Sequence, residues 1–261
     1  MLTLNDFFAI LDKRAPIALS RKLVEQGDYD NSGIIVHSRD RVERVLFSLD
    51  LSAAAVKRAG TLKCDTVVTH HPAIYTPIKS LKKTDDTRAL LAAAKRGLNV
   101  ISMHLNLDVA DGGIDASLMR ALGGEKYRLI DTLSENNGYG REFETDVTLA
   151  QFEKNARAAL KTRRTLTYGA RNAKIKKVAS FCGGGSGYAL AYAEKGGSAD
   201  LLVTSDMPHH IIKELTERGF KLLLITHYAS ENYGFERYYE NVTADCRGKA
   251  ETFFFADKAL S

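Results

Sequence analysis

The sequence predicts an α/β fold made of two similar halves, with mixed, mostly parallel sheets flanked by helices. Two observations support this prediction. Strand and helix patterns alternate almost throughout the 261 residues, as they do in proteins with parallel sheets. The second half also repeats the order of elements in the first, and each copy leaves a strand into a His-x-x-x-carboxylate segment, at His104–Asp108 and at His227–Glu231.

The repeated pattern indicates a duplicated α/β unit. It is much longer than the repeat of a solenoid, so we expect two copies that face each other across a pseudo-twofold axis. We therefore divide the chain into a first half, residues 1–125, and a second half, residues 126–261. The C-terminal segment of the second half is a candidate to pack on the first.

Capping residues mark the ends of helices in the first half. The hydroxyl groups of Thr3 and Ser52 can accept hydrogen bonds from backbone amides at a helix start, and Gly60 and Gly97 suit helix ends. Short apolar runs between the helices predict buried strands. We expect helices at residues 3–12, 16–26, 52–60, 85–97 and 114–122, and strands at 33–36, 44–49, 65–69 and 98–102.

The second half begins after a stretch with weak periodicity. Residues 124–145 are rich in turn residues, so we interpret them as the crossing between the halves. Ser230 is expected to be a helix N-cap, which places Glu231 in the first helical turn, where the helix dipole favours negative charge. We expect helices at residues 149–160, 188–196, 208–219 and 231–241, and strands at 164–167, 176–181, 201–204, 221–225 and 251–255.

The composition is that of a globular protein, with 44% hydrophobic and 26% charged residues. The sequence has no apolar run of the length that crosses a membrane. Residues 1–6 contain an early acid and do not resemble a signal peptide. Cys64, Cys182 and Cys246 are widely spaced and form no CxxC pair, so we expect reduced thiols, a cytoplasmic location and no thiolate zinc site.

The positive charge is concentrated between Lys154 and Lys177, in a chain whose net charge is +5. Such a segment is either a solvated basic face or a surface for an anionic substrate or nucleic acid. The pattern leaves these alternatives open. The segment also contains Arg157, Lys161, Arg163, Arg164, Arg171, Lys174 and Lys176.

Histidines and carboxylates follow the predicted strands, at the sheet edge where open α/β folds bind ligands. Imidazole with carboxylate and without thiolate suits zinc, manganese, iron, cobalt or nickel, and is too rich in nitrogen for calcium. Adjacent His70 and His71 point in different directions, which favours two metals bridged by a carboxylate over one. The alternative is that these groups only orient turns through local hydrogen bonds. The candidate ligands are His70, His71, His104, Asp108, His227 and Glu231.

Several motifs occur in an order that resembles a known family. They are Asp30-Asn31-Ser32-Gly33, Val68-Thr69-His70-His71-Pro72, His104-Leu105-Asn106-Leu107-Asp108, Gly112-Gly113, Gly138-Tyr139-Gly140-Arg141, Gly184-Gly185-Ser186-Gly187 and Thr226-His227-Tyr228-Ala229-Ser230-Glu231. With them the chain resembles the Nif-three-like family, hexameric proteins with a dinuclear metal centre that are also called GTP cyclohydrolase type-two homologues.

The resemblance implies a ligand set and an assembly. His71 and Asp108 would hold one metal, His70 and His227 the other, and Glu231 would bridge them, with His104 as an extra ligand or a group beside the site. It also implies intertwined halves and a toroidal homo-hexamer whose sites face an inner cavity. Tyr29 stands where Trp is usual. Ser205-Asp206 replaces a usual Gly-Glu pair, and because of this last departure a shared substrate is not implied.

Three functions agree with these features. The first is a metal-dependent hydrolase that uses metal-activated water on a phosphoester, nucleotide or amide-type substrate, with His104 and Glu231 as catalytic candidates. The second is a non-catalytic metal-binding or regulatory ring protein. The third is a nucleic-acid-binding protein that uses the basic segment. The first hypothesis requires two divalent transition metal ions per chain and a small or anionic substrate.

Overall fold

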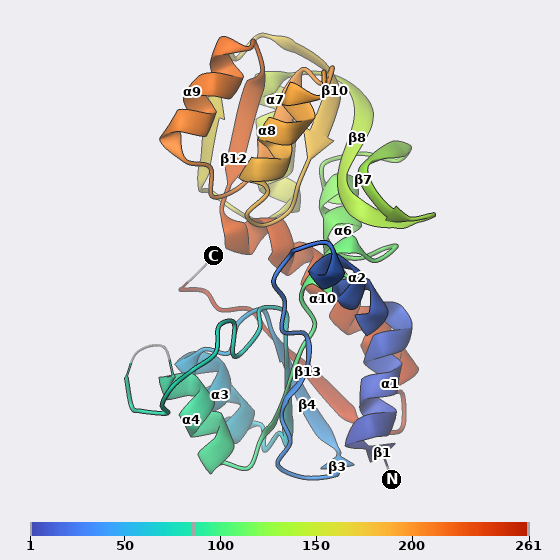
Figure 1. Ribbon diagram of the computed structural model, residues 1–261, viewed down its shortest axis with the longest axis vertical. Coiled ribbons are helices and arrows are strands. Elements are labelled where there is room, and N and C mark those ends of the chain that lie inside the picture. The colour runs from blue at the N-terminus through green and yellow to red at the C-terminus, as the bar shows by residue number, and fades with distance from the viewer. Residues whose placement is uncertain (1, 85–86, 260–261) are drawn as a thin grey trace. The chain divides into compact units, whose positions relative to one another are not determined.

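The computed structural model describes residues 2–84 and 87–259 and divides into two compact units (Figure 1). The first unit contains the chain up to Ala110 together with the C-terminal segment that begins at Phe235. The second unit is Asp111–Gly234. The division after Ala110 lies earlier in the chain than the boundary at residue 125 that the sequence suggested. The chain returns to the first unit within helix α10 (His227–Asp245).

The first unit is built on a five-stranded sheet in the order β13-β4-β5-β6-β2. Strands β13, β4, β5 and β6 are parallel, and β2 pairs antiparallel with β6. A small antiparallel ladder joins β1 to β3. The elements are β1 (Leu2–Thr3), α1 (Leu4–Arg14), α2 (Ile17–Glu25), β2 (Gly33–Val36), β3 (Arg41–Val42), β4 (Arg44–Ser48), α3 (Ala53–Thr61), β5 (Thr66–Thr69), α4 (Arg88–Lys95), β6 (Asn99–Ser102), α5 (Leu105–Val109) and β13 (Glu251–Phe255).

Each face of this sheet is covered by helices. Helices α3 and α4 pack on one face through a core that includes Leu46, Val67 and Val100 (Figure 1). On the other face, the ring of Phe47 lies 6.1 Å from that of Phe235 in α10. The expected helix cap at Ser52 is present, since its hydroxyl oxygen accepts a hydrogen bond from the backbone amide of Ala55. A strand covered on both faces reads as a continuous apolar run, which explains why these strands were predictable.

The second unit is built on a six-stranded sheet in the order β7-β8-β10-β11-β12-β9. Strands β10, β11 and β12 are parallel, whereas β7, β8 and β9 pair antiparallel with their neighbours. The elements are α6 (Ile114–Ala121), β7 (Tyr127–Ser134), β8 (Asn137–Thr148), α7 (Leu149–Ala159), β9 (Thr165–Tyr168), β10 (Lys174–Ser180), α8 (Ser186–Glu194), β11 (Leu201–Thr204), α9 (His209–Glu217), β12 (Lys221–Ile225) and the first turns of α10.

The interpretation of residues 124–145 as an irregular crossing is wrong. These residues form most of the antiparallel hairpin β7–β8, with Tyr127 opposite Phe143 and Ser134 opposite Asn137. The glycines in β8 hid the strand, since glycine is depleted in strands. Gly138 allows close approach of the carbonyl of Asp131, where a Cβ atom would collide with it.

The predicted start of the last long helix is also wrong. Helix α10 begins at His227, so Ser230 lies inside it and Glu231 lies beyond the first turn. The cap is Thr226, whose hydroxyl oxygen accepts from the amide of Ala229 at 3.1 Å. The hydroxyl of Ser230 instead donates to the carbonyl of His227. The helix dipole therefore has less influence on Glu231 than the sequence suggested.

The predicted internal repeat is visible in the two sheets. Each contains three parallel strands in sequence order, β4-β5-β6 and β10-β11-β12, with an antiparallel strand beside the third. The predicted α/β class with mixed sheets and flanking helices is confirmed, although three of the five strand pairs in the sheet of the second unit are antiparallel. In the part of the chain that is described, no helix combines the length and apolar character needed to cross a membrane.

Candidate metal centre

The carboxyl ends of three parallel strands bring the first group of candidate ligands together. Ser48 pairs with Thr69, and Thr69 pairs with Ser102, so β4, β5 and β6 end in one row. His70 and His71 follow β5 directly, and His104 comes two residues after β6. Their position at this edge follows from the register alone, as the sequence predicted.

His70 is fully buried, and its backbone amide donates to the carbonyl of Leu49. Its Nδ1 lies 2.8 Å from the carbonyl oxygen of Met103, which can only accept a hydrogen bond. Nδ1 therefore carries the proton, and in the neutral ring Nε2 presents a lone pair. That Nε2 atom lies 3.5 Å from Oδ1 of Asp108, a buried carboxylate in the short helix α5.

His104 is oriented by a buried carboxylate. Its Nδ1 lies 2.8 Å from Oδ1 of Asp30. Burial alone would raise the pKa of Asp30, but hydrogen bonds from His104, Ser20 and Ser32 outweigh it and lower the pKa to about 2. Asp30 is thus an anion that fixes the proton on Nδ1 of His104 and leaves Nε2 for another partner.

His71 repeats this arrangement with a different carboxylate. Its Nδ1 lies 2.7 Å from Oδ1 of Asp50, in the loop after β4. The rings of His70 and His71 are inclined by 46°, with centroids 4.9 Å apart. The two imidazoles are held by separate partners and have separate directions, in agreement with the expectation from the sequence.

These groups have the chemistry of a metal site. Ligand atoms of His70, His104 and Asp108 all lie within 4.8 Å of one another. Imidazole nitrogen with carboxylate oxygen suits divalent transition metals. An imidazole that binds a metal through one nitrogen usually donates a hydrogen bond from the other nitrogen to a carboxylate or carbonyl, as His70 and His104 do here. The donor set therefore fits a divalent transition metal ion.

The second unit carries its own imidazole and carboxylate pair at the start of α10. Nε2 of His227 lies 2.9 Å from Oε1 of Glu231, one helical turn away. Nδ1 of His227 is paired with the carboxylate of Asp206, which follows β11 and has a positive φ of 48°. These residues again lie beyond the carboxyl ends of β11 and β12, which are parallel neighbours.

A glycine loop makes room for Glu231. Gly183, Gly184 and Gly185 lie in the loop between β10 and α8. Gly183 has a φ of +54°, and a Cβ atom there would collide with the carboxylate of Glu231. Its amide donates to Oγ of Ser230 at 2.9 Å. The loop is therefore shaped to the side chain of Glu231.

Sequence reasoning missed the carboxylates that hold the histidines. Asp30 was quoted only as part of a motif, Asp206 only as a departure from the family pattern, and Asp50 not at all. Each lies far from its histidine in sequence, so spacing gives no signal. Asp50 and Asp206 follow parallel strands closely, and this position is the feature that could have indicated these two residues.

Three other histidines lie on the surface. His37 is exposed and pairs with Asp40. His209 and His210 are exposed at the start of α9. The three cysteines are buried and form no disulfide with one another.

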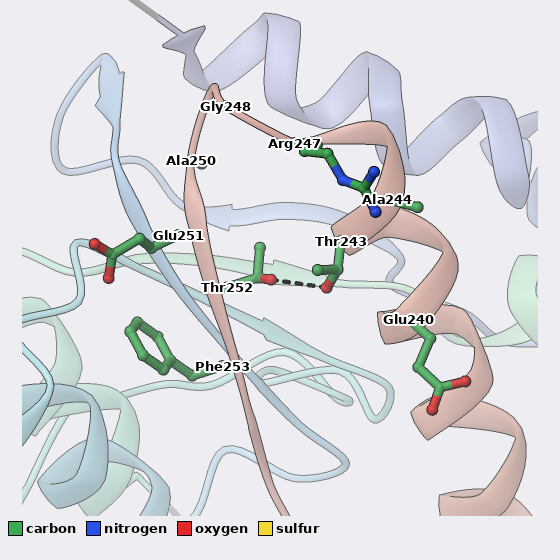
Figure 2. A pocket seen from close by; sticks show the side chains of 9 residues that line it. All are labelled: Glu240, Thr243, Ala244, Arg247, Gly248, Ala250, Glu251, Thr252 and Phe253. Carbon is green, nitrogen blue, oxygen red and sulfur yellow. Dashed lines mark hydrogen bonds between the residues drawn. The ribbon is translucent and has the colours of Figure 1, made fainter.

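A hollow of about 520 Å³ lies between the C-terminal end of α10 and β13, where Thr243 and Thr252 join their hydroxyl groups at 2.7 Å (Figure 2). It contains no histidine or cysteine among its lining residues, so it is not a second candidate metal centre.

The basic segment is exposed in the second unit. No acidic residue occurs between Lys154 and Lys177. Glu153, directly before this segment, is buried and accepts hydrogen bonds from Thr165 and Arg171. These bonds outweigh the effect of burial and lower the pKa of Glu153. The exposed cations are Lys154, Arg157, Lys161, Arg163, Arg164, Arg171, Lys174 and Lys176.

An α/β protein with repeated sheets and clustered imidazole and carboxylate groups is a candidate metal-binding protein, and comparison with known proteins gives its family. A profile of the Duf34/NIF3 family (NGG1p interacting factor 3) matches residues 2–259. The chain therefore belongs to the Duf34/NIF3 family, which confirms the resemblance found in the sequence.

Individual relatives agree with this assignment. The chain is 29% identical over 238 residues to a protein of Clostridium perfringens named GTP cyclohydrolase 1 type 2 homolog, covering 88% of this chain and 87% of the relative. It is 28% identical over 234 residues to NGG1-interacting factor 3 of Saccharomyces cerevisiae, covering 79% and 80%.

Solved structures share the fold. A Bacillus cereus protein related to NIF3 matches with a TM-score of 0.88 and 16% identity, over 99% of this chain and 98% of that one. A Staphylococcus aureus hypothetical protein matches with a TM-score of 0.86 and 22% identity, over 98% and 97%.

Proposed function

We propose that this protein holds two divalent transition metal ions and uses them to activate water for hydrolysis of a phosphoester, nucleotide or amide-type substrate. One observation carries the proposal. In four histidines an oxygen acceptor holds Nδ1, so Nε2 is the nitrogen that would bind a cation, and in two of them Nε2 lies beside a carboxylate of the proposed ligand set. A histidine that only orients a turn needs no such shared arrangement. The four are His70, His71, His104 and His227.

The proposed ligands come from both units. His70, His71, His104 and Asp108 are supplied by the first unit, and His227 and Glu231 by the second. Six donors exceed what one four-coordinate ion takes, which favours two ions, and the family resemblance implies that Glu231 would bridge them. The proposal thus requires the ligands of both units to share the ions. The assignment of each ligand to an ion stays a prediction.

Bound divalent ions supply Lewis-acid chemistry, because they make a water molecule more acidic and neutralise negative charge on a substrate. The side chains of this protein would orient the reacting groups and accept protons. His104 can act as a ligand through Nε2 or as the base that takes a proton from water. In the second role, the carboxylate of Asp30 stabilises the imidazolium that forms. Gly183 and Ser230 fix the loop around Glu231.

The test compares two variants, each with one glutamate of helix α10 replaced by glutamine. Glu231→Gln removes the proposed bridging charge, whereas Glu240→Gln changes an exposed residue of α10. We expect the first variant to lose metal and hydrolysis of a panel of phosphoesters, nucleotides and amides, and the second to retain both. Intact metal content and hydrolysis in Glu231→Gln would refute the proposal. Full metal content in the unaltered protein without turnover would favour a non-catalytic, metal-binding role.

A second candidate function is binding of nucleic acid through the basic segment. The observation that favours it is the group of exposed cations around α7 with its single acid buried. A hollow of about 460 Å³ beside α7 is lined by Lys154, Arg157 and Arg171. Binding that weakens steeply with salt, and weakens further in Lys154→Gln/Arg157→Gln, would support it. Absence of binding to DNA and RNA at low salt would remove it.

We also propose a homo-hexamer in the cytoplasm. The family resemblance supports the hexamer, and three buried cysteines that form no disulfide agree with a reducing compartment. Light scattering after size-exclusion chromatography tests the assembly, and a mass other than six chains would contradict it.

A further inference from the structure

Two exposed tyrosines lie beside the candidate metal centre in the first unit. Tyr29 and Tyr75 are 48% and 51% exposed, and they are among the few large apolar side chains that reach the surface. Their rings meet edge to face, with centroids 5.2 Å apart and an interplanar angle of 70°. An aromatic pair that leaves about half of its surface in water has ring area available for a ligand.

The pair is directly connected to the site. The ring of Tyr75 lies 6.1 Å from that of His104, at an interplanar angle of 87°. Tyr29 precedes Asp30, the carboxylate that holds His104. A group stacked on the two tyrosines would therefore place its substituents near His70, His104 and Asp108.

The loops that carry the two rings are joined to each other. The side-chain amide of Asn31, two residues after Tyr29, donates to the carbonyl of Ile74, the residue before Tyr75, at 2.7 Å. The hydroxyl of Ser32 accepts from the backbone amide of His104 at 3.0 Å. These bonds tie the loops that carry the rings to each other and to His104, so binding a ligand does not require the loops to be brought together.

We propose that Tyr29 and Tyr75 form a stacking site for a planar heteroaromatic ring of the substrate. The proposal rests on the hydrolase function above and narrows its substrate to a mononucleotide-like molecule, whose ring binds the tyrosines while its phosphate reaches the metal ligands. Two rings offer far less area than a stable protein interface requires, so the pair suits a small molecule. Stacking tolerates different bases, and we therefore expect little discrimination between them.

The absence of tryptophan from the sequence allows a direct assay. Tyr29→Trp introduces a single tryptophan at the proposed site of the full-length protein, and its emission is followed during titration. We expect saturable quenching by adenosine, both in metal-loaded protein and after chelator treatment, and no effect of ribose 5-phosphate. AMP and GMP should bind within about tenfold of each other. AMP should bind more tightly than adenosine only in the metal-loaded protein.

Further variants test the second ring. Adding Tyr75→Ala to Tyr29→Trp should weaken adenosine binding by about tenfold or more, whereas Tyr75→Phe should preserve it, since stacking needs no hydroxyl group. Leu166→Trp, at a 61% exposed position of the second unit, is the matched control and should show no saturable quenching. Thermal unfolding of each variant establishes that the fold is retained.

Three results would overturn the proposal. The first is unchanged emission with millimolar adenosine, and the second is equal adenosine binding with and without Tyr75→Ala. The third is an emission shift that depends on protein concentration, which would show that a second copy of the chain covers the rings. Equal affinity for AMP and adenosine in the metal-loaded protein would overturn the link to the metal ligands. Because adenosine binding requires neither metal nor turnover, failure of the hydrolase function would appear separately, as missing metal or activity.

Discussion

Asp30→Asn tests whether the histidines are oriented to bind metal. The carboxylate of Asp30 is fully buried and receives hydrogen bonds from His104, Ser20 and Ser32. Asparagine has the same shape, but its amide lacks the negative charge that makes the imidazole of His104 a strong ligand. Loss of such a partner typically weakens metal binding by about 10- to 100-fold, or roughly 1.4–2.7 kcal/mol.

The pKa of Asp30 gives an independent magnitude. A fall from 3.8 to about 2 corresponds to roughly 2 kcal/mol of folding free energy in the metal-free protein. Because the folded pKa is the lower one, this stability is present above about pH 4 and is lost as the pH falls towards 2. Asp30→Asn should therefore lower the unfolding free energy at pH 7 by about 2 kcal/mol and remove that part of the acid dependence.

The assay measures metal affinity by competition with a chelator, under conditions where urea titration shows the variant to be folded. Asp40→Asn is the matched control, since Asp40 pairs with His37 at 2.9 Å on the exposed surface. We expect tenfold or greater loss of affinity for Asp30→Asn and no change for Asp40→Asn. Equal affinity in both folded variants would refute the reasoning about imidazole orientation.

Three further predictions concern the second unit. Gly183→Ala should reduce metal content, because its Cβ would collide with Glu231, whereas Gly187→Ala, with open space around it, should not; elemental analysis compares them. Arg141→Met should lower the unfolding free energy by about 3–5 kcal/mol in urea, since it leaves the buried carboxylate of Asp115 without its cation; a loss below about 1 kcal/mol would contradict this. Glu153→Gln should make the unfolding free energy less dependent on pH in the acid range. The lowered pKa of Glu153 contributes stability that is present above pH 4.5, its ordinary pKa, and is lost as the pH falls. An unchanged acid-denaturation profile would argue against it.

The fold was predictable where side chains carry a clear period. The central strands β4, β5, β6, β11 and β12 have apolar residues side by side, because these strands are buried on both faces of their sheets. The hairpin β7–β8 was missed because glycines interrupt its pattern, and the start of α10 because Ser230 resembles a cap that Thr226 provides. Local sequence gives the type of an element more reliably than the residue that begins it.

The place of the candidate ligands in the fold was also predictable, since each follows or lies near a strand end. Their supporting groups were not. Asp30 and His104, or Asp206 and His227, meet through tertiary folding, and no spacing in the sequence records that pairing. The exposure of Tyr29 and Tyr75 likewise depends on how two loops pack, which composition does not reveal.

The most direct test of the central claim is the metal content of the protein purified without chelators or an affinity tag, measured by elemental analysis. The claim predicts about two divalent transition metal ions per chain. It also predicts a marked loss of both ions when Glu231→Gln and His70→Ala are introduced separately, one substitution in each unit. Folded protein that contains no transition metal after this purification, or full metal content in both variants, would contradict it.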